Sequence, residues 1–121
     1  MTSKINLLIT GATGFVGREL VRSLLLTEKF NIHITKRSDK IYFNEGVAEF
    51  NCGNLENFDD KKNILNNIDI IIHLAGRAHQ VGNKKKNYFE EYQKANQYSI
   101  SNLSNQASKS GVKKFIFLST L

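Results

Sequence analysis

The feature that most constrains the fold of this chain is a set of three evenly spaced glycines near its start, Gly11, Gly14 and Gly17. An apolar run, Ile5–Thr10, comes directly before them. After them, apolar residues recur at helical spacing as far as about Leu26. The sequence therefore predicts a buried strand, a tight turn and an amphipathic helix in direct succession.

Each glycine of such a strand-to-helix turn has its own predicted role. Gly11 permits the tight reversal of the backbone, and Gly17 lets the helix pack closely on the strand. Gly14 leaves out a Cβ atom where a pyrophosphate has to approach the main chain. The start of the helix offers free N–H groups and the positive end of its dipole to phosphates. The turn is therefore predicted to bind a dinucleotide cofactor.

The rest of the chain alternates between strand-like and helix-like segments. Strands are predicted over residues 30–35, 47–51, 68–74 and 115–118, and helices over residues 59–67 and 88–110. Gly111 stands where a helix-ending glycine belongs. With the first strand this pattern predicts one α/β domain over residues 1–121, a Rossmann-type doubly wound parallel sheet of five strands. Because the sequence stops at Leu121, we expect an incomplete domain, truncated after the fifth strand.

Charge and composition exclude several classes of function. The formal net charge is +6, but the basic residues are scattered, and the one run at 84–86 lies in a polar segment that predicts a loop. No basic stripe interleaved with aromatic residues accompanies it, so we expect no nucleic-acid binding. No apolar run is long enough to cross a bilayer, and no signal peptide is present, so we expect no membrane association.

The cysteine and histidine residues argue against a disulfide and a metal site. Cys52 is the single cysteine, which excludes an internal disulfide and fits a cytoplasmic protein. It is expected to be an inert, half-buried thiol. The three histidines, His33, His73 and His79, are too dispersed to predict a metal site. His73 is expected to be a packed strand residue.

The residues that end the second predicted strand bear on the choice of cofactor. An acidic residue ordinarily stands there and binds the adenosine ribose, whereas this chain has Lys36 and Arg37. The two cations could pair with the 2′-phosphate of NADP. Alternatively, both side chains face solvent at the end of the strand. The cofactor is therefore predicted to be NAD or NADP, with a tilt toward NADP.

Three motifs together resemble the extended short-chain dehydrogenase/reductase family, which includes UDP-glucose 4-epimerases and related nucleotide-sugar dehydratases and 4-keto reductases. They are Thr10-Gly-Ala-Thr-Gly-Phe-Val-Gly17, His73-Leu-Ala-Gly76 and Phe115-Ile-Phe-Leu-Ser-Thr120. Their order and separations fit the family over the whole chain. Residues 73–79 look most like members from O-antigen and capsular polysaccharide pathways.

The resemblance implies a role for particular residues in holding the coenzyme. Asn54 and Leu55 stand where the family places an aspartate and an apolar residue against the adenine, and Asn54 offers only a neutral carbonyl there. Leu74, Ala75 and Gly76 are implied to pass along the nicotinamide ribose. The implied pyrophosphate contacts are Gly11, Thr13, Gly14, Phe15, Val16 and Gly17.

The same resemblance also bears on catalysis. Thr120 matches the catalytic Ser/Thr position, and Asn96 matches an asparagine that braces the cofactor side of the site. The family's Tyr-x-x-x-Lys pair, which provides the base, does not occur in this chain, and neither does a substrate domain.

The resemblance therefore implies the NAD(P)-binding portion of a nucleotide-sugar epimerase, dehydratase or 4-keto reductase. A nucleotide sugar is the implied substrate of the complete enzyme. We expect this chain to be inactive alone, and we do not expect it to form the homodimer usual in the family. Two alternatives stay open: a non-catalytic NAD(P)-binding regulatory protein and an inactive remnant of a truncated gene.

Overall fold

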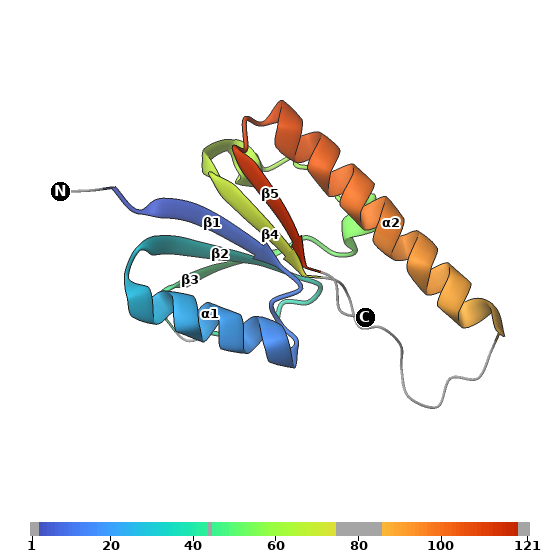
Figure 1. Ribbon diagram of the computed structural model, residues 1–121, viewed down its shortest axis with the longest axis horizontal. Helices are drawn as coiled ribbons and strands as arrows, with labels where there is room; N and C mark the ends of the chain where they lie inside the picture. Colours follow the sequence, from blue (N-terminus) through green and yellow to red (C-terminus); the bar gives the residue numbers. More distant parts are fainter. Residues whose placement is uncertain (1–2, 44, 75–85, 119–121) are drawn as a thin grey trace.

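The computed structural model describes residues 3–43, 45–74 and 86–118 of the chain (Figure 1). The strands are β1 (Ile5–Thr10), β2 (Phe30–Lys36), β3 (Val47–Asn51), β4 (Ile70–Leu74) and β5 (Lys114–Leu118). The helices are α1 (Phe15–Thr27) and α2 (Lys86–Lys109). Two short 3₁₀ turns, η1 (Leu55–Asn57) and η2 (Ile64–Asn67), lie between β3 and β4.

The strands form one parallel sheet in the order β3-β2-β1-β4-β5. This order confirms the predicted Rossmann-type sheet. The chain runs outward from β1 to β3 and then returns to the other side of β1, so the order reverses between β1 and β4. Open α/β sheets bind ligands outside the carboxyl ends of the strands at such a reversal. The glycine turn follows β1 and therefore lies at this point.

The two helices cover opposite faces of the sheet (Figure 1). Successive strand residues point to opposite faces, and the two cores follow this alternation. Leu7 and Ile9 pack with Val21 of α1, whereas Leu8 packs with Leu103 of α2. The arrangement is the predicted doubly wound one. Among the described residues, neither helix is long and apolar enough to cross a membrane.

The end of α2 confirms the predicted role of Gly111. The helix ends at Lys109, and Gly111 has a φ of +81°, in the left-handed region that favours glycine. The N–H of Val112 then donates to the carbonyl of Ala107 at 3.1 Å. This hydrogen bond reverses the chain at the helix end and leads it into β5.

The helix predicted over residues 59–67 is wrong. The Asp60 carboxylate accepts hydrogen bonds from the N–H groups of Ile64 and Leu65 at 2.7 and 2.9 Å, and Asn63 has a φ of +55°. Side-chain bonds of this kind compete with the helical ladder, and a left-handed residue interrupts it. The segment therefore forms only the short turn η2, and the strand expected from Ile68 begins at Ile70.

The connection between β3 and β4 is fastened to α2 by two amide side chains. Asn102 donates to the carbonyls of Leu55 and Phe58 at 3.0 and 2.6 Å. The N–H of Asp60 donates to the Gln106 side-chain oxygen at 2.7 Å. These bonds fix the segment that contains the predicted adenine contacts in place beside the sheet.

Candidate cofactor-binding site

The glycine turn has the backbone geometry that the sequence predicts at Gly11 and Gly17. Gly11 has a φ of +75°, and a Cβ atom there would lie 2.9 Å from the carbonyl oxygen of Leu74 at the end of β4. A Cβ atom on Gly17 would lie 2.5 Å from the Cα of Ala12. Real Cβ atoms do not come this close to backbone, so these two positions require glycine to close the turn and to seat α1 on β1.

Gly14 is different, because a Cβ atom there would meet nothing within 4 Å. It has an ordinary extended conformation, with φ −80° and ψ 178°, and it caps the start of α1 without a side-chain hydrogen bond. Phe15 and Val16 beside it are 83% and 62% exposed. The absence of a side chain at Gly14 therefore keeps open the space in front of the helix start, where N–H groups can meet an anion.

A shallow depression borders the turn on the α1 side. Its lining residues are Thr13, Gly14, Phe15, Arg18, Glu19 and Arg22. Arg18 extends along the turn, and its Nε donates to the carbonyl of Thr13 at 2.9 Å. An arginine so placed adds positive charge beside the start of α1.

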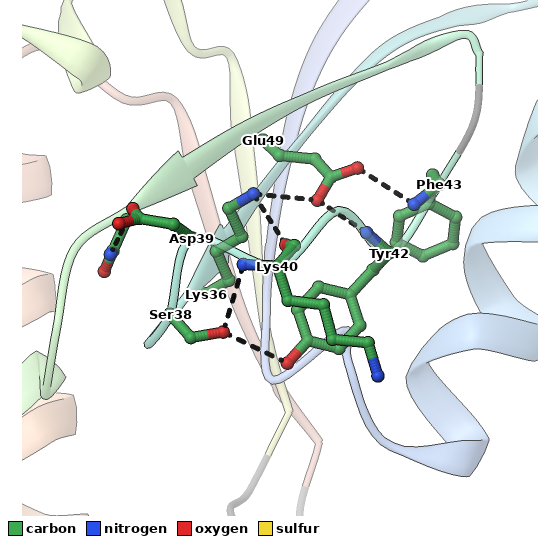
Figure 2. A network of polar contacts seen from close by, with 8 residues as sticks. Lys36, Ser38, Asp39, Lys40, Tyr42, Phe43 and Glu49 are labelled. Atoms are coloured by element: carbon green, nitrogen blue, oxygen red, sulfur yellow. Dashed lines mark hydrogen bonds and ion pairs between the residues drawn. The ribbon is translucent and has the colours of Figure 1, made fainter.

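The structure separates the two cations predicted to meet a 2′-phosphate. Lys36 is nearly buried: its Nζ donates to Glu49 Oε1 at 3.2 Å and to the carbonyl of Lys40 at 2.8 Å (Figure 2). Arg37 is exposed. Of the two side chains, Lys36 is therefore engaged within the protein, and Arg37 faces solvent at the end of β2.

Tyr42 joins the segment after β2 to the glycine turn, a contact that the sequence analysis did not find. The guanidinium carbon of Arg18 lies 5.6 Å from the centre of the Tyr42 ring. Lys40 Nζ lies 5.4 Å from the same ring. Both distances are typical of cation–π interactions. The only signal in the sequence is the position of Arg18, directly after the last glycine.

The other predicted site residues are spread over three elements. Leu74 is buried at the end of β4, in contact range of Gly11. Asn54 is exposed just before η1, and Leu55 is half-buried against the α2 side of the core. Asn96 is half-buried on α2. Three further predicted residues, Ala75, Gly76 and Thr120, lie outside the described residues.

His73 is a packed strand residue, as predicted. It is 4% exposed, and its Nδ1 shares a hydrogen bond of 2.5 Å with the Thr10 hydroxyl. Its ring lies 5.6 Å from that of Phe117 and 6.1 Å from that of Phe115. Burial lowers the pKa of His73. The residue thus ties β1 to β4 and β5 close to the turn, in its neutral form.

We expect this neutral histidine to make the fold sensitive to mild acid. The unfolded chain takes up a proton on the imidazole near pH 6.5, whereas burial resists protonation of His73 in the folded chain. Its contribution is complete above pH 6.5 and decreases below it, by at most about 1.4 kcal/mol per pH unit. Urea unfolding at pH 7 and pH 5 should show this fall in wild type and a smaller fall in His73→Gln. Equal falls in both proteins contradict the prediction.

Cys52 carries no reactive thiolate. Its thiol is half-buried, and burial, with a smaller effect of Asp60, raises its pKa to about 11. The thiol is therefore protonated at neutral pH and inert, as the sequence predicts. No group of three or more His, Cys, Asp or Glu side chains that could hold a metal ion occurs within the part of the chain that the structure describes.

Comparison with known proteins decides the family. Residues 8–121 match the model of the 3-beta hydroxysteroid dehydrogenase/isomerase family. The chain belongs to this family. Membership confirms the resemblance to the extended short-chain dehydrogenases/reductases drawn from the three motifs.

One protein of similar sequence is an epimerase. The UDP-glucose 4-epimerase of Vibrio cholerae is 34% identical over 116 residues, which cover 96% of this chain and 35% of the epimerase. The chain therefore spans about a third of the length of this relative.

Solved structures show the same fold. The yeast methylglyoxal/isovaleraldehyde reductase complexed with NADPH has a TM-score of 0.70 at 15% identity, covering 93% of this chain and 36% of the reductase. A short chain dehydrogenase from Leptospira borgpetersenii with bound NAD⁺ has a TM-score of 0.64 at 21% identity, covering 88% of this chain and 45% of the dehydrogenase.

Proposed function

We propose that this chain is the coenzyme-binding part of an NAD(P)-dependent nucleotide-sugar epimerase, dehydratase or 4-keto reductase. The observation that carries the proposal is the open space at Gly14, in front of the start of α1 and at the reversal point of the sheet. The NADPH and NAD⁺ in the two similar structures support a nicotinamide dinucleotide. The epimerase relative supports a nucleotide sugar as the substrate of the whole protein.

The residues of the turn can hold the coenzyme by elementary electrostatics. Free N–H groups at the start of α1 and the dipole of the helix stabilise a pyrophosphate. Leu74 lies next to Gly11, so residues 74–76 are proposed to pass along the nicotinamide ribose. Asn54 and Leu55 are proposed to contact the adenine, and Asn96 to brace the same side.

The chemistry of the whole protein is proposed to be hydride transfer at a sugar carbon, for which the coenzyme supplies the acceptor. Thr120 is proposed to donate a hydrogen bond to the reacting oxygen of the sugar and to stabilise the charge that develops there. We place this reaction in the biosynthesis of polysaccharide sugars, of the O-antigen or capsule kind.

Coenzyme titration combined with an assay on nucleotide sugars tests the proposal. NADH and NADPH are titrated by fluorescence, and UDP-sugars are then incubated with the protein and separated by chromatography. Coenzyme binding by this chain without conversion of a UDP-sugar is the result expected of the coenzyme-binding part alone. Conversion by a longer protein that contains this chain supports the proposal in full, and coenzyme binding without conversion by that longer protein favours the non-catalytic NAD(P)-binding protein. No binding of either coenzyme contradicts both.

We further expect NADPH to bind at least as well as NADH, because Arg37 replaces the acid that ordinarily binds the ribose. The Arg37→Gln variant should lose about tenfold in NADPH affinity, as expected for one charge-assisted hydrogen bond, and keep its NADH affinity. The control is Lys113→Gln, which removes one charge before β5, beside Asp69 at the opposite end of the sheet. If both variants discriminate between the coenzymes as wild type does, Arg37 plays no part in the choice.

A further inference from the structure

The Glu49 carboxylate of β3 is the centre of a nearly buried polar network at the end of β2 (Figure 2). Its side chain and that of Lys36 are each 9% exposed. One oxygen accepts from Lys36 Nζ at 3.2 Å and from the N–H of Tyr42 at 3.0 Å. The other oxygen accepts from the N–H of Phe43 at 2.9 Å. Both oxygens of a single side chain are thus engaged by the two ends of one segment, residues 36–43.

This network is ionic at neutral pH. Burial by itself raises the pKa of Glu49, but the hydrogen bonds from Tyr42 and Phe43 and the charge of Lys36 outweigh it, so the pKa lies below its ordinary value. The Glu49 carboxylate compensates the positive charge of Lys36. The cations of the segment that remain exposed are Arg37 and Lys40, while the carboxylate of Asp39 accepts a hydrogen bond from Asn51 at 2.9 Å.

The segment that Glu49 holds lies against the glycine turn. Tyr42 contacts Arg18, which in turn donates to the carbonyl of Thr13. In Rossmann sheets the residues that follow β2 face the adenosine ribose. The position of Arg37 and Lys40 relative to that ribose therefore depends on how residues 36–43 are folded back.

We propose that Glu49 is a positioning residue for the adenosine end of the coenzyme. It draws the Lys36 ammonium into the protein and fixes residues 37–43 so that Arg37 and Lys40 face a 2′-phosphate. The choice of NADPH over NADH is then set by the exposed cations and by Glu49 behind them, and not by Lys36. The inference rests on the proposed binding of NAD(P) at the glycine turn.

Two substitutions separate the role of Glu49 from that of Lys36. In Glu49→Gln one of the two accepting oxygens is replaced by an NH2 group, which donates and cannot accept a hydrogen bond, so one anchor of the segment is lost and Lys36 loses its counter-charge. NADPH affinity should fall about tenfold, as for one charge-assisted hydrogen bond, with NADH affinity unchanged. In Lys36→Met both backbone bonds to Glu49 remain, and the ratio of the two affinities should stay within about twofold of wild type.

The measurement is a fluorescence titration of NADPH and NADH against wild type, Glu49→Gln and Lys36→Met, with thermal unfolding of each protein. Equal weakening of both coenzymes in Glu49→Gln shows a general loss of stability and overturns the positioning role. A loss of NADPH affinity in Lys36→Met as large as that in Glu49→Gln shows direct contact by Lys36 and also overturns it. Wild type that binds neither coenzyme contradicts the proposed function itself.

A second measurement covers the case in which Glu49→Gln does not fold. The double variant Lys36→Met with Glu49→Gln leaves no buried charge without a partner, and the same loss of discrimination is expected. In the protein without coenzyme, the amides of Tyr42 and Phe43 should exchange at least about tenfold faster in this variant than in wild type. Unchanged exchange at both amides overturns the inference.

Discussion

The Gly14→Val variant is expected to fold as wild type does and to lose affinity for NADH and NADPH by about a hundredfold or more. The added side chain meets no protein atom within 4 Å of its Cβ, and the backbone at this position is extended, a conformation that valine favours. Its methyl groups would fill the space in front of α1. A pyrophosphate displaced by them loses at least two charge-assisted hydrogen bonds, worth about 1.5–3 kcal/mol each.

Coenzyme titration by fluorescence or calorimetry, together with circular dichroism and thermal unfolding, measures both halves of this expectation. The matched control is Ser23→Val, which adds the same side chain on an exposed position of α1. Equal affinity in wild type and in folded Gly14→Val is the outcome that rules out coenzyme binding at the turn.

Gly17→Ala is expected to destabilise the fold, whereas Gly14→Ala is not. The single carbon added at Gly17 falls 2.5 Å from Ala12 Cα and 2.6 Å from the carbonyl oxygen of Gly11. Both are backbone atoms that cannot rotate away, so α1 has to move off β1, where Val21 is fully buried. Overpacking of this kind costs about 1–3 kcal/mol or more, a large part of a typical total of about 5–15 kcal/mol.

Helix propensity alone predicts the opposite result, a more stable Gly17→Ala protein, so the direction of the change in stability decides between the two effects. Gly17 lies within α1, where alanine is better than glycine by about 1 kcal/mol when nothing obstructs it. Urea unfolding should nevertheless show a lower free energy of unfolding for Gly17→Ala, and a change within about 1 kcal/mol for Gly14→Ala. A Gly17→Ala protein as stable as wild type contradicts the close packing of α1 on the turn.

The glycine turn and the order of elements could be predicted because their signals are local. The strand, the three glycines and the apolar helical stripe all lie within residues 5–27. The need for glycine at Gly11 and Gly17 comes from backbone atoms packed directly against them. Alternation of strands and helices then predicts a doubly wound sheet. The sequence also places Gly111 correctly at the end of α2, for the same local reason.

The interactions at the end of β2 could not be predicted, because they depend on which residues of neighbouring strands lie side by side. From the sequence alone, Lys36 is expected to be an exposed cation at the end of the strand. Only the register of β3 on β2 shows that Glu49 lies opposite Ile34 and within hydrogen-bond distance of Lys36. The contact of Arg18 with Tyr42 spans elements far apart in sequence. The helix predicted over residues 59–67 does not form, because the Asp60 carboxylate accepts hydrogen bonds from the N–H groups of Ile64 and Leu65, which a helix would pair with backbone carbonyls.

The most direct test of coenzyme binding at the glycine turn is a titration of the ¹⁵N-labelled chain with NADPH, followed by amide chemical shifts. The account predicts that the shift changes concentrate at residues 11–18, in the glycine turn and at the start of α1, and at Arg37 and Lys40 after β2. The amides of Asp69 and Lys113, just before β4 and β5 at the opposite end of the strands, should keep their chemical shifts. The absence of any change at millimolar NADPH, or changes confined to that opposite end, would contradict the account.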